Sequence, residues 1–183
     1  MAEFRKRVHV PVPVAQLFAW HERPGAFQRL SPPWDRPEVV SHVGGIRDGA
    51  RVELRVHTGP VPTTWRLEHR DYLENRQFRD VLLAGPFRSW VHTHAFEADG
   101  EHASVLDDHI VYELPLGALG DAIAGRFADS TLARVFAYRH AVTVGDLERH
   151  AEFAARPRLR VAITGATGFI GSQLAAFLST GGH

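Results

Sequence analysis

The sequence has 183 residues, with 21 lysine and arginine residues against 21 aspartate and glutamate residues, so its formal net charge at pH 7 is zero. This length suits one well-buried domain and a short additional segment. The balanced charge argues against a nucleic-acid partner, and the absence of cysteine excludes disulfides, thiolate nucleophiles and cysteine-ligated zinc. No stretch has the length of a membrane span or the pattern of a secretory signal, so we expect a soluble, cytoplasmic protein.

The first residues predict one strand followed by two short helices. Residues 4–11 read as a strand with apolar residues for the core. Pro13 suits the first turn of a helix over 14–20, because its missing N–H costs nothing there. A second helix over 23–30 ends before two consecutive prolines.

The middle of the chain predicts an antiparallel meander. Turn residues (Gly, Pro, Asn and Asp) recur at a spacing of roughly 8 to 14 residues and leave short links between apolar runs. The expected strands cover residues 39–43, 51–58, 63–72, 77–84, 89–98 and 103–114. Such a sheet must bury one face against a partner.

The partner is a long helix predicted over residues 120–154. Helical spacing places a broad apolar face on one side. This face carries Ile123, Phe127, Leu132, Val135, Phe136, Tyr138 and Val142. The opposite face carries Arg126, Asp129, His140 and Glu148. Arg139 interrupts the pattern, because it points with the apolar stripe, and we expect it to face the interior.

This order of elements, an α+β arrangement of β, α, α, six β and α, resembles the helix-grip fold of the START/Bet v 1-like superfamily, also called the SRPBCC or polyketide cyclase-like family. The resemblance rests on four stretches: residues 23–34, 85–96, 107–116 and 136–140. It implies one domain over residues 1–154, with a curved sheet of about seven strands around the long helix. It also implies a cavity between sheet and helix that binds a hydrophobic or aromatic small molecule.

Strand alternation selects the side chains that would line this cavity, because residues two apart share a face. The inward set contains aromatic residues and a few polar ones, as small-molecule sites require. We expect the lining to include Trp34, Trp65, Phe78, Trp90, His92, His94, Tyr112 and Arg139. Trp34, which follows the two prolines, fits either a lid residue or a residue that packs on the sheet edge.

The polar inward residues leave three interpretations open. His92 and His94 have metal-ligand spacing, and Asp108, Asp80 or His69 offers a third ligand. A catalytic site is a second interpretation, with His92, His94, Asp108 and Arg139 as the candidates for acid/base work. The third is a set of hydrogen-bonded residues in a wet cavity, with Arg139 neutralising an inward aspartate. Because the sequence does not place a third ligand nearby, we assign no metal.

After a linker over residues 155–158, the character of the chain changes. Residues 160–164 predict a buried strand, and an apolar helix follows over 172–178. The intervening pattern T-G-A-T-G-F-I-G resembles the nucleotide-binding start of the NAD-dependent epimerase/dehydratase family, the extended short-chain dehydrogenases. That resemblance assigns Gly165, Gly168 and Gly171 to the cofactor pyrophosphate, at a helix N-terminus.

This second unit, residues 159–183, is an incomplete Rossmann start. The acidic ribose-binding residue belongs about 20 residues beyond the first glycines, and a βαβ unit needs about 30 residues. The Tyr-x-x-x-Lys pair of that family is also absent. We therefore expect no cofactor in this chain, NAD(P) only in a longer bacterial fusion protein, and a tail that self-associates or lies on the first domain.

We consider three functions for this chain and rank them in order of preference. The first is binding of a hydrophobic or aromatic molecule, as the N-terminal module of an epimerase- or reductase-like fusion. The second is a cyclase- or aromatase-like enzyme that uses the cavity histidines, aspartate and arginine. The third is a regulatory interaction domain of the cell-division inhibitor type.

Overall fold

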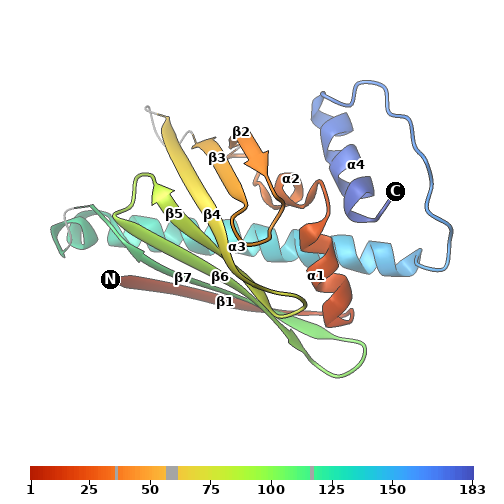
Figure 1. Cartoon of the computed structure of the whole chain (residues 1–183), viewed down its shortest axis with the longest axis horizontal. Helices are drawn as coiled ribbons and strands as arrows, with labels where there is room; N and C mark the ends of the chain where they lie inside the picture. Colours follow the sequence, from red (N-terminus) through yellow and green to blue (C-terminus); the bar gives the residue numbers. More distant parts are fainter. Residues whose placement is uncertain (36, 57–61, 116–117) are drawn as a thin grey trace.

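The computed structural model describes residues 1–35, 37–56, 62–115 and 118–183. Within the long helix over residues 118–152, it describes side chains from residue 125 onward. The elements of residues 1–154 follow the predicted order, and the helix predicted near the C-terminal end is also present (Figure 1). The strands are β1 (Ala2–Val10), β2 (Glu38–Val43), β3 (Arg51–Val56), β4 (Thr63–Leu73), β5 (Gln77–Ala84), β6 (Ser89–Ala98) and β7 (Ser104–Glu113). The helices are α1 (Val14–Glu22), α2 (Ala26–Leu30), α3 (Ala118–Glu152) and α4 (Phe169–Thr180).

The seven described strands form one antiparallel sheet in the order β1-β7-β6-β5-β4-β3-β2. Strands that are consecutive in the sequence from β2 to β7 are neighbours in the sheet, as is usual where few residues separate them. The α1–α2 segment separates β1 from β2, which lie at opposite edges of the sheet. In Figure 1 the sheet lies across α3, so the predicted helix-grip architecture is confirmed.

The strand alternation predicted from sequence is also confirmed. On β6, His92, His94 and Phe96 are buried, with 2%, 7% and 4% of their surfaces exposed. Thr93 and Ala95, between them, are only partly buried. The inward row of β6 therefore lies on the buried side of the sheet, as the period of two requires.

The buried face of α3 agrees in part with the predicted one, because Leu132, Val135 and Phe136 are common to both. The buried residues recur at intervals of three and four: Leu132, Val135, Phe136, His140, Thr143, Asp146 and Leu147. His140, predicted to face outward, is 4% exposed, whereas Phe127, predicted to face the sheet, is 65% exposed. The prediction ranked helix positions by hydrophobicity. It misplaced part of the buried face, because three of the buried residues, His140, Thr143 and Asp146, are polar. Ile123 lies outside the described side chains.

Residues 157–163 form no strand, in contrast to the strand predicted over 160–164. A strand needs a neighbour to satisfy its backbone N–H and C=O groups, and none of the described strands pairs with this segment. The predicted apolar helix is present as α4 and begins three residues earlier than expected. No helix among the described residues is long and apolar enough to cross a membrane.

The helix α4 docks on the first domain, beside α2 and the end of α3 (Figure 1). The guanidinium of Arg29 forms two 2.8 Å hydrogen bonds to Asp146 of α3 and one of 3.1 Å to Gln173 of α4. Arg23 donates to the carbonyl oxygen of Thr180 at 2.7 Å. Of the two placements expected for the tail, the structure shows the one on its own domain.

Gly25 gives a test of this docking, because it has φ of +97° and a Cβ there would lie 2.6 Å from the Ala176 carbonyl oxygen. We expect Gly25→Ala to lower the free energy of unfolding by about 2–3 kcal/mol through backbone strain plus the clash. The substitution should also speed proteolysis of the segment before α4. Urea unfolding and limited trypsin digestion measure the two effects.

Gly100→Ala is the matched control, since Gly100 has φ of +76° but open space where a Cβ would lie. It should cost about 1–2 kcal/mol from strain alone and leave digestion unchanged. Equal effects of both substitutions would contradict the close contact between α2 and α4.

Candidate functional site

Two aspartates and four histidines meet on the concave side of the sheet. Strand register brings them together, because His92 pairs with Asp80 of β5 and His94 pairs with Asp108 of β7. His69 of β4 lies opposite Asp80, and His140 reaches the group from α3. The group, called here the His/Asp cluster, consists of His69, Asp80, His92, His94, Asp108 and His140.

Asp108 is the central acceptor of the cluster. Its Oδ1 lies 2.9 Å from His92 Nε2, and its Oδ2 lies 2.7 Å from His140 Nε2. His94 Nδ1 also lies 2.7 Å from Oδ1, although ring and carboxylate are not aligned for a hydrogen bond. One carboxylate thus connects β6, β7 and α3.

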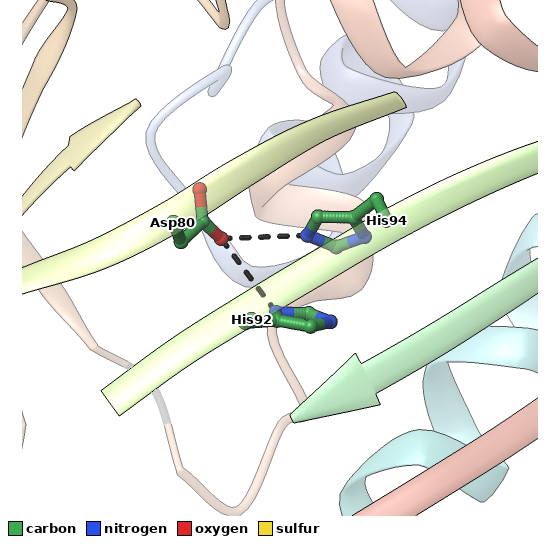
Figure 2. Close-up of side chains that lie close together, drawn as sticks. All are labelled: Asp80, His92 and His94. Carbon is green, nitrogen blue, oxygen red and sulfur yellow. Dashed lines mark hydrogen bonds and ion pairs between the residues drawn. The ribbon is translucent and has the colours of Figure 1, made fainter. Parts of the chain in front are cut away.

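Asp80 holds the other side of the cluster through looser contacts. Its Oδ2 lies 3.4 Å from His94 Nε2 and 3.6 Å from His92 Nδ1 (Figure 2). Its Oδ1 lies 2.9 Å from His69 Nε2. Each of His92 and His94 therefore presents one ring nitrogen to Asp80 and the other to Asp108.

Burial and charge act in opposite directions on these groups. Burial opposes ionisation of both aspartates, yet the neighbouring histidines hold the pKa of Asp80 and of Asp108 well below the ordinary value. Burial likewise opposes a charge on His94, but the charge of Asp108 and the contacts to both carboxylates raise its pKa to about 9. Protonated His94 thus compensates part of the buried negative charge.

A small cavity borders the cluster beneath α2. It has a volume of about 10 Å³, which is room for about one water molecule. Its polar lining comes from His21, His94, Asp108, Arg139, His140 and Thr143. Leu30, Leu106 and Phe136 supply the apolar lining.

Arg139 faces this interior, as its place in the helical stripe indicated, but it does not pair with an aspartate. Its Nε donates to the Leu30 carbonyl oxygen at 3.2 Å, and its guanidinium lies 5.0 Å from the Phe136 ring centroid. Burial lowers its pKa, opposed by the charges of Asp108 and Asp80. We expected Arg139 to neutralise an inward aspartate. Among the described residues, histidines contact Asp80 and Asp108 instead.

The residues predicted to line one cavity separate into several groups. His94 and Arg139 border the cavity, while Phe78 stacks on His94 in the core with ring centroids 4.3 Å apart. Trp65, Trp90 and Tyr112 form an aromatic group with Phe87 elsewhere on the sheet. Tyr112 donates to Asp129.

Trp34 lies at the surface, 48% exposed, with its ring against Tyr138 and under Arg134 of α3. Sequence reasoning missed His21 and His140. A buried histidine on a helix gives no periodic signal that separates it from a solvated one, so only tertiary contacts identify it.

Three glycines of the tail, Gly165, Gly168 and Gly171, gather where α4 begins. Gly165 has φ of +68°, and Gly168 precedes the first helical residue. A Cβ at Gly171 would lie 2.2 Å from the Gly165 carbonyl oxygen, so the helix start packs directly on the loop. None of the described strands leads directly into this loop.

Comparison with known proteins decides the family. Residues 1–152 match the family described as polyketide cyclase / dehydrase and lipid transport. The chain belongs to this family. No curated protein matches it.

Solved structures extend the comparison for this polyketide cyclase-like domain. A nucleoside-diphosphate sugar epimerase from Corynebacterium glutamicum is similar with a TM-score of 0.77 and 28% identity, covering 98% of this chain and 37% of that one. The chain thus spans little more than a third of that protein.

Two more distant structures share the fold alone. An aromatase/cyclase from a Streptomyces species has a TM-score of 0.64 and 16% identity, covering 84% of this chain and 98% of that one. A START superfamily protein from Mycobacterium smegmatis has a TM-score of 0.61 and 14% identity, with 80% and 97% covered.

The environment of His21 gives a pH prediction. Burial lowers the pKa of His21 to about 4, and its ring contacts Leu17 and lies near His94, Asp108 and His140. The pKa of His21 is lower in the folded than in the unfolded chain. Its contribution to stability is therefore fully present above pH 6.5 and is lost as the pH falls towards 4. The loss attributable to His21 is about 3 kcal/mol at pH 4.

We expect His21→Phe to remove this part of the acid sensitivity. The ring is kept among its aromatic neighbours, so the substitution should cost only about 1 kcal/mol at pH 7. Urea unfolding of both proteins between pH 4 and 7 measures the difference. Parallel stability curves for the two proteins would show that His21 is not held neutral in the folded state.

Proposed function

We propose that this polyketide cyclase-like domain binds a small molecule that has an apolar or aromatic body and an anionic or carbonyl oxygen. The observation that supports the proposal is the position of Arg139. Its side chain borders an interior cavity, and its described contacts are one carbonyl oxygen and one aromatic ring. A guanidinium without a carboxylate partner is suited to bind an oxygen of a ligand.

The cavity must enlarge for this function, because about 10 Å³ admits no more than about one water. Leu30 is the lining residue best placed to move, since it ends the five-residue helix α2 and is only partly buried. Displacing Leu30 would open the apolar side of the cavity and free the Arg139 Nε. The polar side, fixed by the His/Asp cluster, would stay in place.

Ligand binding can be tested with anilinonaphthalene sulfonate, an aromatic anion whose fluorescence rises in apolar sites. Arg139→Met should weaken binding about 10- to 100-fold, the usual effect of losing a charge-assisted hydrogen bond. Leu30→Ala should strengthen binding, because it enlarges the cavity. Native mass spectrometry of the purified protein would identify any natural ligand.

Arg134→Met is the matched control, because Arg134 lies on the same helix but over the Trp34 ring at the surface. It should bind the dye as the wild type does. If Arg139→Met and Leu30→Ala also leave dye binding unchanged, and no molecule co-purifies, the binding proposal is wrong.

A proton-transfer enzyme is the second candidate, and one observation favours it. His94 and His140 both border the cavity and both contact Asp108, an arrangement in which a carboxylate orients a general base. A bound molecule with an acidic C–H should then exchange that hydrogen for deuterium in heavy water. We expect His140→Gln to abolish the exchange, and exchange equal to that without protein would contradict catalysis.

We further infer that the domain works as the N-terminal module of a longer epimerase-like protein. The glycine spacing at the start of α4 supports this context, as does the similarity of nearly the whole chain to part of an epimerase. NAD(P) would be the cofactor of that longer protein, with Gly165, Gly168 and Gly171 at its pyrophosphate. Sequencing the complete gene tests this inference. If the gene encodes no Tyr-x-x-x-Lys pair, the inference of an epimerase-like protein is wrong.

A further inference from the structure

We propose that Asp80, His92 and His94 bind one first-row divalent metal ion, of which zinc is the representative case. The three side chains come from the neighbouring strands β5 and β6 and turn towards one another (Figure 2). Each offers one ligand atom, and these atoms lie within 4.8 Å of one another. The structure thus supplies the third ligand whose position the sequence did not show.

The distances around Asp80 suit a shared metal ion better than direct hydrogen bonds. Its Oδ2 lies 3.4 Å from His94 Nε2 and 3.6 Å from His92 Nδ1. Hydrogen bonds to a carboxylate are usually shorter than about 3.0 Å. Two ligand atoms of a tetrahedral ion, each about 2.0–2.1 Å from it, are about 3.3–3.4 Å apart. Small ring rotations would bring both nitrogens to this geometry.

The opposite sides of the same rings have the partners that metal-bound histidines require. A ligating histidine usually gives its second ring N–H to a carboxylate, which fixes the ring and raises its basicity. His92 Nε2 and His94 Nδ1 lie 2.9 and 2.7 Å from Oδ1 of Asp108. His69 supports the carboxylate ligand in the same way, at 2.9 Å from Oδ1 of Asp80.

The charge of the cluster also favours a cation. Asp80 and Asp108 place two carboxylates in a site whose other members are histidines, and buried negative charge requires compensation. A divalent ion would balance the charge of both carboxylates.

Two nitrogens and one carboxylate oxygen form a ligand set of zinc and of other first-row divalent ions. Three protein ligands leave a further coordination position for water. The Asp80 side chain, 19% exposed, gives the site contact with solvent, while the side chains of His92 and His94 are 3% and 8% exposed. This metal site does not depend on ligand binding at Arg139, so either proposal can fail alone.

The test uses the full chain without a histidine tag, stripped of metal with EDTA. Titration with Co(II) should give one bound ion per chain and the visible absorption of a four- or five-coordinate site, and Zn(II) should displace it. We expect Asp80→Asn and His94→Gln each to weaken binding at least about 100-fold, and Asp108→Asn to weaken it about 10- to 100-fold. His102→Gln, an exposed histidine between β6 and β7, is the control and should bind as the wild type does.

The wild-type protein provides a second measurement if a cluster variant fails to fold. Saturating Zn(II) should raise its thermal midpoint by about 5–10 °C, with the rise complete at one equivalent at protein concentrations far above the dissociation constant. A wild type that shows neither stoichiometric Co(II) binding nor this rise would overturn the proposal. So would a folded His94→Gln variant that binds Co(II) as tightly as the wild type.

Discussion

The contact between Asp108 and His140 is the constraint on which the interior of this domain depends. A carboxylate buried under a helix is tolerated only when donors or positive charges surround it. Here His92 and His140 form hydrogen bonds with Asp108, and His94 lies 2.7 Å from it. Because His92 belongs to the sheet and His140 to α3, the polar contacts fix the rotation of the helix about its own axis. The aromatic residues then fill the space that this rotation leaves, with Phe136 against His92 and Phe4.

The sheet could be predicted from sequence far better than the helix face. Alternation has a period of two, so one correctly placed strand orients all its side chains, and His92, His94 and Asp108 were assigned inward on that ground. The stripe of α3 was inferred from hydrophobicity, which fails where inward residues are polar. His140 and Phe127 were therefore exchanged between faces, whereas Arg139, adjacent to strongly apolar neighbours, was placed correctly.

The sequence could not provide the distances between side chains on different strands or the size of the cavity. The pairing of Asp80 with His92 depends on the register between β5 and β6, which no single strand encodes. The size of the cavity likewise depends on many side chains, among them the buried Phe78, Phe96 and Phe136. A family fold therefore predicts where a cavity lies, while its volume depends on residues that the fold does not prescribe. The missing strand over residues 160–164 follows the same logic, because pairing is a property of neighbours.

The short helix α2 has a consequence for communication along the chain. Its Arg29 side chain binds Asp146 of α3 and Gln173 of α4, and the next residue, Leu30, covers the cavity and accepts the Arg139 N–H. A helix of five residues has little capacity to absorb movement within itself. Displacement of α4 would thus shift the cover of the interior site. The C-terminal helix and the interior of the first domain are therefore mechanically linked through α2.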